Sequence, residues 1–130
     1  MKEYTQEEMD QALKDGVKDF SGCYFLGLNL KRANLEGADF KWANLQGTNL
    51  RRANLKRANF EYSDLTSANL EGANLTMANL TGAQLRWAKF RQATLTGANL
   101  TSAKLTGAKF TGAILGEYIF GKKIKKGNES

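Results

Sequence analysis

The sequence contains no histidine, no proline and only one cysteine, Cys23. It also has no long run of apolar residues. Without histidine the commonest general base and metal ligand are missing, and a lone cysteine cannot form an internal disulfide. A segment apolar enough to be a transmembrane helix or a secretory signal is also lacking. We therefore expect a soluble, cytoplasmic protein that is not an enzyme and uses no cofactor and no metal.

The formal net charge of +6 is unevenly distributed along the 130 residues. Residues 1–19 carry six acids and three bases, whereas residues 20–116 carry twelve bases and five acids. The absence of proline keeps every backbone N–H available for strand pairing. A basic surface attracts nucleic acid or another anionic partner, but a surface charge that only keeps a small protein soluble has the same composition. Both interpretations stay open.

A five-residue period runs through most of the chain. Every fifth residue from Phe20 to Phe120 is Leu or Phe, at 21 consecutive positions, and all seven phenylalanines lie among them. Two residues before each of these, over positions 33–113, the sequence has Ala with two exceptions, Thr48 and Ser63. The unit reads A-(N/D)-L-x-x, and a fixed period of this kind indicates a solenoid.

The positions within the unit predict their own geometry. Ala and Leu are two residues apart and point to one side of a short extended segment, while the Asn between them points to the other. The last two positions must turn the chain, and nine of the 13 glycines occupy the second of them, as a permissive backbone would require. Arg52, Arg57 and Trp87 occupy the same position. This predicts that a positive φ is not compulsory there and that two turn types are mixed.

The period fits three-sided and four-sided coils, and the bulky side chains favour four sides. A spacing of twenty residues stacks Phe20 with Phe40 and Phe60, Phe90 with Phe110, and Trp42 with Tyr62, whereas a spacing of fifteen aligns only Phe25 with Phe40. We expect a structural core that includes Phe20, Phe40, Phe60, Leu75, Phe90 and Phe110. Cys23 is expected to be a core residue, and Asn and Asp are expected to support the turns by hydrogen bonds to the backbone.

Units such as Ala33-Asn34-Leu35, Ala73-Asn74-Leu75 and Ala98-Asn99-Leu100 resemble the repeat of the pentapeptide-repeat protein family over roughly residues 20–120. The resemblance implies an all-β solenoid, a right-handed four-sided β-helix of about five coils with 20 residues each. The family is plentiful in bacteria, and its most familiar members mimic DNA and protect gyrase. Mimicry of a duplex requires a long acidic rod, which this short basic chain does not provide.

The two ends differ. Thr5 and Glu8 form a capping box, which predicts a helix over residues 6–15 within an N-terminal segment, 1–19, that caps the first coil. The β-helix is expected over 20–120, followed by a basic flexible tail over 121–130. Tyr118 would plug the last coil of a monomer, or this end would form a dimer.

A basic and aromatic corner is the candidate site. In the four-sided register, one corner carries Lys31, Arg32, Arg51, Arg52 and Arg91, the neighbouring corner carries Lys56 and Arg57, and the next carries Trp42 and Tyr62. Arg, Trp and Tyr dominate binding hot spots, although such side chains also cover the outside of adjacent coils without any function. We expect a scaffold or adaptor that binds an unknown protein partner there, and not a membrane. The alternatives are direct nucleic-acid binding and a DNA mimic that acts on a topoisomerase.

Overall fold

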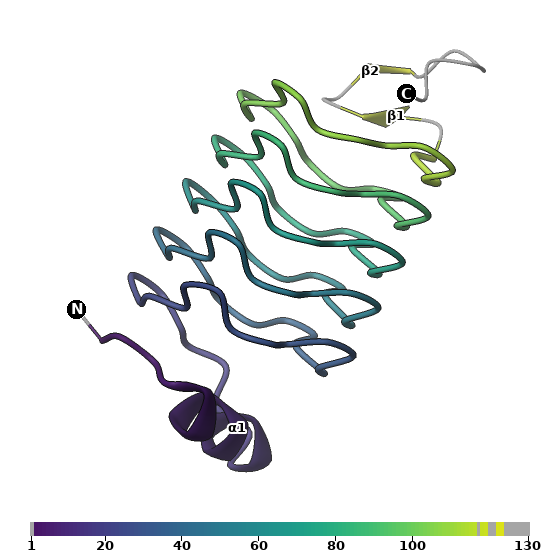
Figure 1. Cartoon of the computed structure of the whole chain (residues 1–130). Coiled ribbons are helices and arrows are strands. Elements are labelled where there is room, and N and C mark those ends of the chain that lie inside the picture. Colours follow the sequence, from purple (N-terminus) through teal and green to yellow (C-terminus); the bar gives the residue numbers. More distant parts are fainter. Residues whose placement is uncertain (1, 117, 120–121, 124–130) are drawn as a thin grey trace.

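The computed structural model describes residues 2–116, 118–119 and 122–123. A short extended segment with Glu3 bridged to Tyr24 precedes helix α1 (Gln6–Lys14), and the chain then continues in stacked coils (Figure 1). After the coils, β1 (Tyr118–Ile119) pairs antiparallel with β2 (Lys122–Lys123). Most of the expected tail over 121–130 lies outside the described residues.

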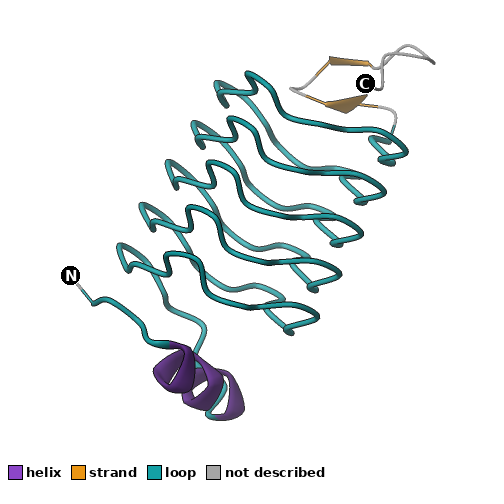
Figure 2. Ribbon diagram, in the orientation of Figure 1, coloured by secondary structure: helices purple, strands orange, loops and turns teal. Residues whose placement is uncertain are grey.

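Parallel β-bridges join each coil to the next. They connect outward positions that are twenty residues apart, such as Asp19 with Asp39 and Asn54 with Asn74. Twenty residues hold four five-residue units, so each coil has four sides. Every side contributes one bridged residue, and for this reason Figure 2 draws the coils as loops rather than strands. The four-sided register predicted from the bulky side chains is the register of the structure.

The interior is filled by the Leu, Phe and Ala positions. Phe40 lies between Phe20 and Phe60, with ring centroids 5.3 and 5.2 Å apart, and Phe90 stacks on Phe110 at 4.8 Å. Leu75 and the expected phenylalanines are fully buried except Phe110, which is only partly buried. Phe110 belongs to the last complete coil, where the described residues place no further coil over it. Burial of each large side chain contributes about 1.5–3 kcal/mol.

The corners correct one expectation from the sequence. The last residue of each five-residue unit, which is the second residue of a corner, has a positive φ whether or not it is glycine. The φ is 57° at Arg52 and 70° at Gly37. The non-glycine residues in this conformation are Arg32, Trp42, Arg52, Arg57, Tyr62, Ser67, Met77, Trp87, Gln92 and Ser102. The prediction of two mixed turn types, with no compulsory positive φ, was therefore wrong. The corners that follow Phe20 to Phe110 all share this conformation and the hydrogen bond of a β-turn, as from Ala53 N–H to Leu50 C=O at 3.1 Å.

The outward Asn and Asp residues support these corners as expected. Asn74 Oδ1 accepts the backbone N–H of Thr76 at 3.0 Å, two residues further on. Asp39 and Asp64 do the same for Lys41 and Thr66, each at 2.9 Å. These two aspartates lie in different bridge columns, and so on different sides of the coil. They are turn-supporting residues and do not form a carboxylate pair.

The N-terminal segment lies against the first coil. The capping box of Thr5 and Glu8 is present, and α1 ends one residue before the predicted limit. The backbone N–H of Thr5 and the ammonium of Lys2 both bind the Glu8 carboxylate, which lowers the pKa of Glu8 to about 2. Met9 is fully buried in the same hydrophobic cluster as the first coil.

Side chains at the corners lean over the glycine of the next coil. A Cβ at Gly107 would overlap the Trp87 ring, and one at Gly82 would lie 2.5 Å from the Tyr62 ring. A Cβ at Gly37 would meet no atom within 4 Å. All of these glycines adopt the positive φ of the corner. Gly82 and Gly107 also leave space for the aromatic ring that packs on them.

This difference predicts unequal effects for two identical substitutions. Both Gly37→Ala and Gly107→Ala place a side chain at a positive φ, which costs about 1–2 kcal/mol. Only Gly107→Ala must also displace Trp87. In a Trp42→Phe background, we expect the fluorescence of Trp87 to shift to longer wavelength in Gly107→Ala and to stay unchanged in Gly37→Ala. An unshifted spectrum in both variants would show that Trp87 does not rest on Gly107.

Candidate binding surface

The predicted site residues lie on three of the four corners of the coil. Lys31, Arg51 and Arg91 share one corner, because they are separated by multiples of twenty residues. Lys56 and Arg57 lie at the following corner, and Trp42 belongs to the corner after that. In a four-sided coil the first and the third corner are diagonally opposite. The basic residues of the first corner and the aromatic residues of the third corner therefore do not share one surface.

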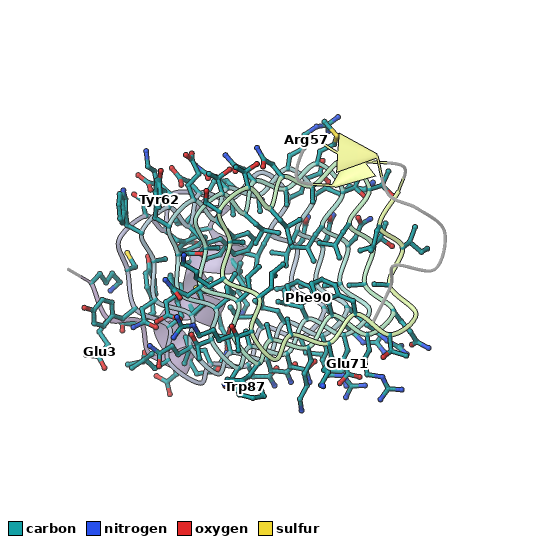
Figure 3. All side chains as sticks on the ribbon, turned by 90° about the horizontal axis from the view of Figure 1, so that it is seen from above. Glu3, Arg57, Tyr62, Glu71, Trp87 and Phe90 are labelled. Atoms are coloured by element: carbon teal, nitrogen blue, oxygen red, sulfur yellow. The ribbon has the colours of Figure 1, made fainter. Side chains whose placement is uncertain are left out.

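Figure 3 shows this division. Arg57 and Tyr62 lie along one side of the molecule, Glu71 and Trp87 lie along the opposite side, and Phe90 lies in the interior between them. Glu71 marks the corner that also carries Arg51 and Arg91, one coil before and one coil after it. The corner of Lys56 and Arg57 is thus next to both the corner of Arg51 and the corner of Trp42.

We call the side between the first two corners the basic face. Its outward positions are Asn34, Asn54, Asn74, Thr94 and Ile114. Its corners carry Lys31, Arg32, Arg51, Arg52, Lys56, Arg57 and Arg91. All seven of these basic residues are exposed except Arg51, which is half-buried. The ladder of parallel bridges fixes the positions of both corners relative to each other.

Few carboxylates neutralise the basic face. Within residues 2–116, Arg57 is the one member of this set with a carboxylate within 4 Å, that of Glu36 at 4.0 Å. Glu71 lies in the column of Arg51 and Arg91 but forms no ion pair with them in the part of the chain that is described. Arg51 Nε is buried and has no hydrogen-bond partner among the described residues. The positive charge of this face is therefore available to another molecule.

The aromatic corner consists of Trp42 and Tyr62. Their rings stack at 4.6 Å with 18° between the planes, as the twenty-residue spacing predicted. Their exposed fractions are 61% and 46%. Tyr62 rests on Gly82, so the outer face of Trp42 is the free aromatic surface of the pair. One side of the coil, with Asp39 and Asn59 pointing outward, separates this corner from Lys56 and Arg57.

Other kinds of site find no support in the described residues. No group of three or more Cys, Asp or Glu side chains could hold a metal ion there. Cys23 is half-buried, as a core position of the first coil would be, and burial raises the pKa of its thiol. Among the described helices, none is long and apolar enough to cross a membrane.

Two structural features were missed by sequence reasoning. Gln6 lies at the start of α1, and its side-chain amide pairs with both backbone groups of Asn29, at 2.8 Å each. Sequence reasoning placed Trp42 and Tyr62 on a separate corner, but it did not conclude that this corner lies diagonally opposite that of Arg51. Gln6 left no signal in the five-residue pattern, whereas the order of the corners follows from counting units along the chain.

The comparisons with known proteins agree with this architecture. The family description "Pentapeptide repeats" matches residues 19–52, 38–76 and 78–116, with 8 copies. The crystal structure of a pentapeptide repeat protein, Rfr23, from the cyanobacterium Cyanothece 51142 is 34% identical with a TM-score of 0.53, and the match covers 74% of this chain and 63% of that one. The present chain thus spans less than two thirds of the length of Rfr23.

A second structure is that of a pentapeptide repeat protein from the thylakoid lumen of Arabidopsis thaliana. It is 33% identical with a TM-score of 0.49, and the match covers 86% of this chain and 67% of that one. A comparison with curated proteins found no match. Because the repeat description covers most of the sequence, this chain belongs to the pentapeptide repeat family, whose fold is a right-handed, four-sided β-helix.

Proposed function

We propose that the protein is a non-catalytic scaffold or adaptor whose basic face binds an acidic surface of a partner protein. The observation that carries the proposal is the uncompensated charge of this face: of its seven basic residues, only Arg57 has a carboxylate within 4 Å among the described residues. The face is fixed by a continuous hydrogen-bonded ladder. Binding to it therefore costs little conformational entropy.

The aromatic corner distinguishes a protein partner from the second candidate, which is nucleic acid. A protein that extends from the basic face around the corner of Arg57 would reach Trp42, and aromatic anchors contribute strongly to protein interfaces. A duplex that lies on the basic face needs only the cations for its phosphates. We favour the protein partner because the exposed aromatic pair lies next to that corner. A basic face does not suit a mimic of DNA.

The substitution of Arg51, Arg52 and Arg57 by Gln tests the proposed function. We expect this triple variant to keep its β-helix and its melting temperature, because close like charges are removed, and to lose capture of its partner from the native cell extract. The matched control changes Arg86, Lys104 and Lys109 to Gln. It removes the same charge from exposed positions on other sides, and it should still capture the partner.

Three further results would decide against the proposal. Unchanged capture by the Arg51, Arg52 and Arg57 variant would show that the basic face only keeps the protein soluble. Loss of capture in both triple variants would indicate that net charge matters and the face does not. The third result is binding of a duplex DNA probe. If its affinity falls steeply as the salt concentration rises, and is the same in the double variant Trp42→Ala, Tyr62→Ala, the partner is nucleic acid.

A further inference from the structure

The N-terminal segment and Phe20 together close most, but not all, of the open edge of the β-helix. The N–H groups of Tyr24, Asn29 and Asp39 donate to Lys2 C=O, to Gln6 Oε1 and to Lys18 C=O, each at 2.8 Å. The C=O groups of the same three residues accept from Tyr4 N–H at 2.9 Å, from Gln6 Nε2 at 2.8 Å and from Phe20 N–H at 2.7 Å. Three sides of the coil are thus closed.

The fourth side belongs to the basic face and is open at Asn34. Neither the N–H nor the C=O of Asn34 has a hydrogen-bond partner among residues 2–116, 118–119 and 122–123. In the coils above, the equivalent N–H of Asn54 donates to Ala33 C=O at 2.9 Å. Asn34 is exposed. A donor and an acceptor without partners on the same strand edge form a template for an added strand.

The protein already contains an example of such an added strand. Lys2–Tyr4 lies parallel to the coil and pairs with Tyr24 through Lys2 C=O and Tyr4 N–H. The same two hydrogen bonds at Asn34 require only three extended residues. The middle residue would form the bridge, and its two neighbours would supply the C=O and the N–H.

The charges next to Asn34 favour one order of acidic and basic residues along the added strand. A parallel strand would begin near the corner of Lys31 and Arg32 and end near the corner of Glu36. Lys31 and Arg32 are exposed and have no carboxylate within 4 Å in the described chain. Glu36 is exposed and is only loosely paired with Arg57, at 4.0 Å. Acidic residues are therefore favoured before the bridged residue, and a basic residue after it.

We infer that Asn34 is a β-addition site for an extended segment of a partner protein, with acidic residues first and a basic residue last. The inference rests on the proposed function in one respect, since Lys31 and Arg32 belong to the basic face. The site adds a defined backbone contact to the basic face, and the neighbouring charges select the segment that binds there.

Two variants of Asn34 distinguish the contribution of its backbone N–H to binding from that of its side chain. Asn34→Pro removes the N–H, which no described residue accepts, whereas Asn34→Ala keeps the N–H and removes the side chain. Both should fold, with melting temperatures close to that of the wild type. Asn54→Pro is the control for the fold, because it removes the hydrogen bond to Ala33 C=O and should be strongly destabilised.

The binding test uses two peptides of the same composition and NMR of the amide groups. The first peptide is acetyl-Glu-Asp-Val-Thr-Val-Lys-amide, and the second has the reversed order, acetyl-Lys-Val-Thr-Val-Asp-Glu-amide. We expect the first to shift the amides around Asn34 saturably in the wild type and in Asn34→Ala. It should bind Asn34→Pro up to about tenfold more weakly, as the loss of a hydrogen bond implies. The reversed peptide should bind the wild type less tightly.

The results that overturn the inference are equally specific. They are equal binding to Asn34→Pro and to the wild type, amide shifts confined to other parts of the chain, or no shift with either peptide. The variant with Gln at Arg51, Arg52 and Arg57 keeps Asn34 and should still bind the first peptide. Failure of the proposed function at those arginines would therefore leave the peptide result unchanged, and the two failures are distinguishable.

Discussion

Leu75→Asp should abolish the cooperative thermal unfolding of the protein or lower its melting temperature by more than about 10 °C. Leu75 is fully buried in a central coil, between the Leu positions of the coils before and after it. The substitution removes about 1.5–3 kcal/mol of hydrophobic burial and leaves a carboxyl group without hydrogen-bond partners, which costs roughly 2–7 kcal/mol more. Circular dichroism during heating measures the effect.

Thr76→Asp is the control for this prediction. Thr76 follows Leu75 in the sequence, but its side chain lies at a corner and is only half-buried. Its Oγ1 donates to Asn74 Oδ1 at 2.6 Å, and the substitution removes this one hydrogen bond, which costs about 1 kcal/mol. Equal melting temperatures for Leu75→Asp and Thr76→Asp would show that the inward and outward positions have been assigned wrongly.

The register could be predicted from sequence because it depends on which side chains fill the interior. A short extended segment alternates its side chains, so Ala and Leu must share one side and Asn must take the other. Phe20, Phe40 and Phe60 then fix the number of units per coil, because their rings stack only when the repeat is twenty residues. No finer knowledge of the backbone is needed for this step.

The conformation of the corners could not be predicted in the same way. Arg57 and Trp87 prefer a negative φ by themselves, and a positive φ costs about 1–2 kcal/mol per residue. The ladder overrides this local preference, because Arg57 N–H must reach Thr76 C=O, at 3.0 Å, in the next coil. A rule based on single residues gives the wrong result wherever many hydrogen bonds act together to fix one backbone shape.

The site was predicted less well than the fold, for a related reason. Arg51 and Trp42 are close in sequence, but they lie on diagonally opposite corners because each unit of five residues turns the chain once. The open edge at Asn34 depends on where Lys2–Tyr4 and Gln6 lie, and these residues belong to no repeat. The structure of the repeated part of the chain can thus be predicted from its period. How the end of the β-helix is closed can be seen only in the three-dimensional structure.

This closure explains why the N-terminal segment should matter for solubility. Tyr4 stacks on Phe25 with ring centroids 5.0 Å apart and contacts the edge of Phe20 at 5.6 Å. Met9 is fully buried beside them in the core cluster. In a solenoid each coil is stabilised by its neighbours, so an uncovered end is the weakest point. The role of α1 as a cap is therefore a prediction with a direct test.

Deletion of residues 1–16 should make the protein aggregate at concentrations at which the full chain does not. The truncated chain loses the hydrogen bonds of Tyr24 to Lys2 and Tyr4 and those of Asn29 to Gln6, and it exposes Phe25 together with a second and third open edge. Residues 1–16 carry five acids and two bases, so the formal charge would rise from +6 to +9. A higher net charge opposes association, and aggregation would therefore have to come from the uncovered end.

Light scattering and size-exclusion chromatography at several protein concentrations measure this effect. The full-length variant Gln6→Glu is the milder companion, because it keeps the chain intact and removes only the side-chain NH2 group, which donates to Asn29 C=O and to Asp10 Oδ1. We expect it to stay soluble with a melting temperature lower by a few degrees, as the loss of about 1–2 kcal/mol implies. If the truncated chain remains monomeric and as stable as the full chain, α1 is not a cap, and its exposed acidic side becomes a candidate surface for a partner.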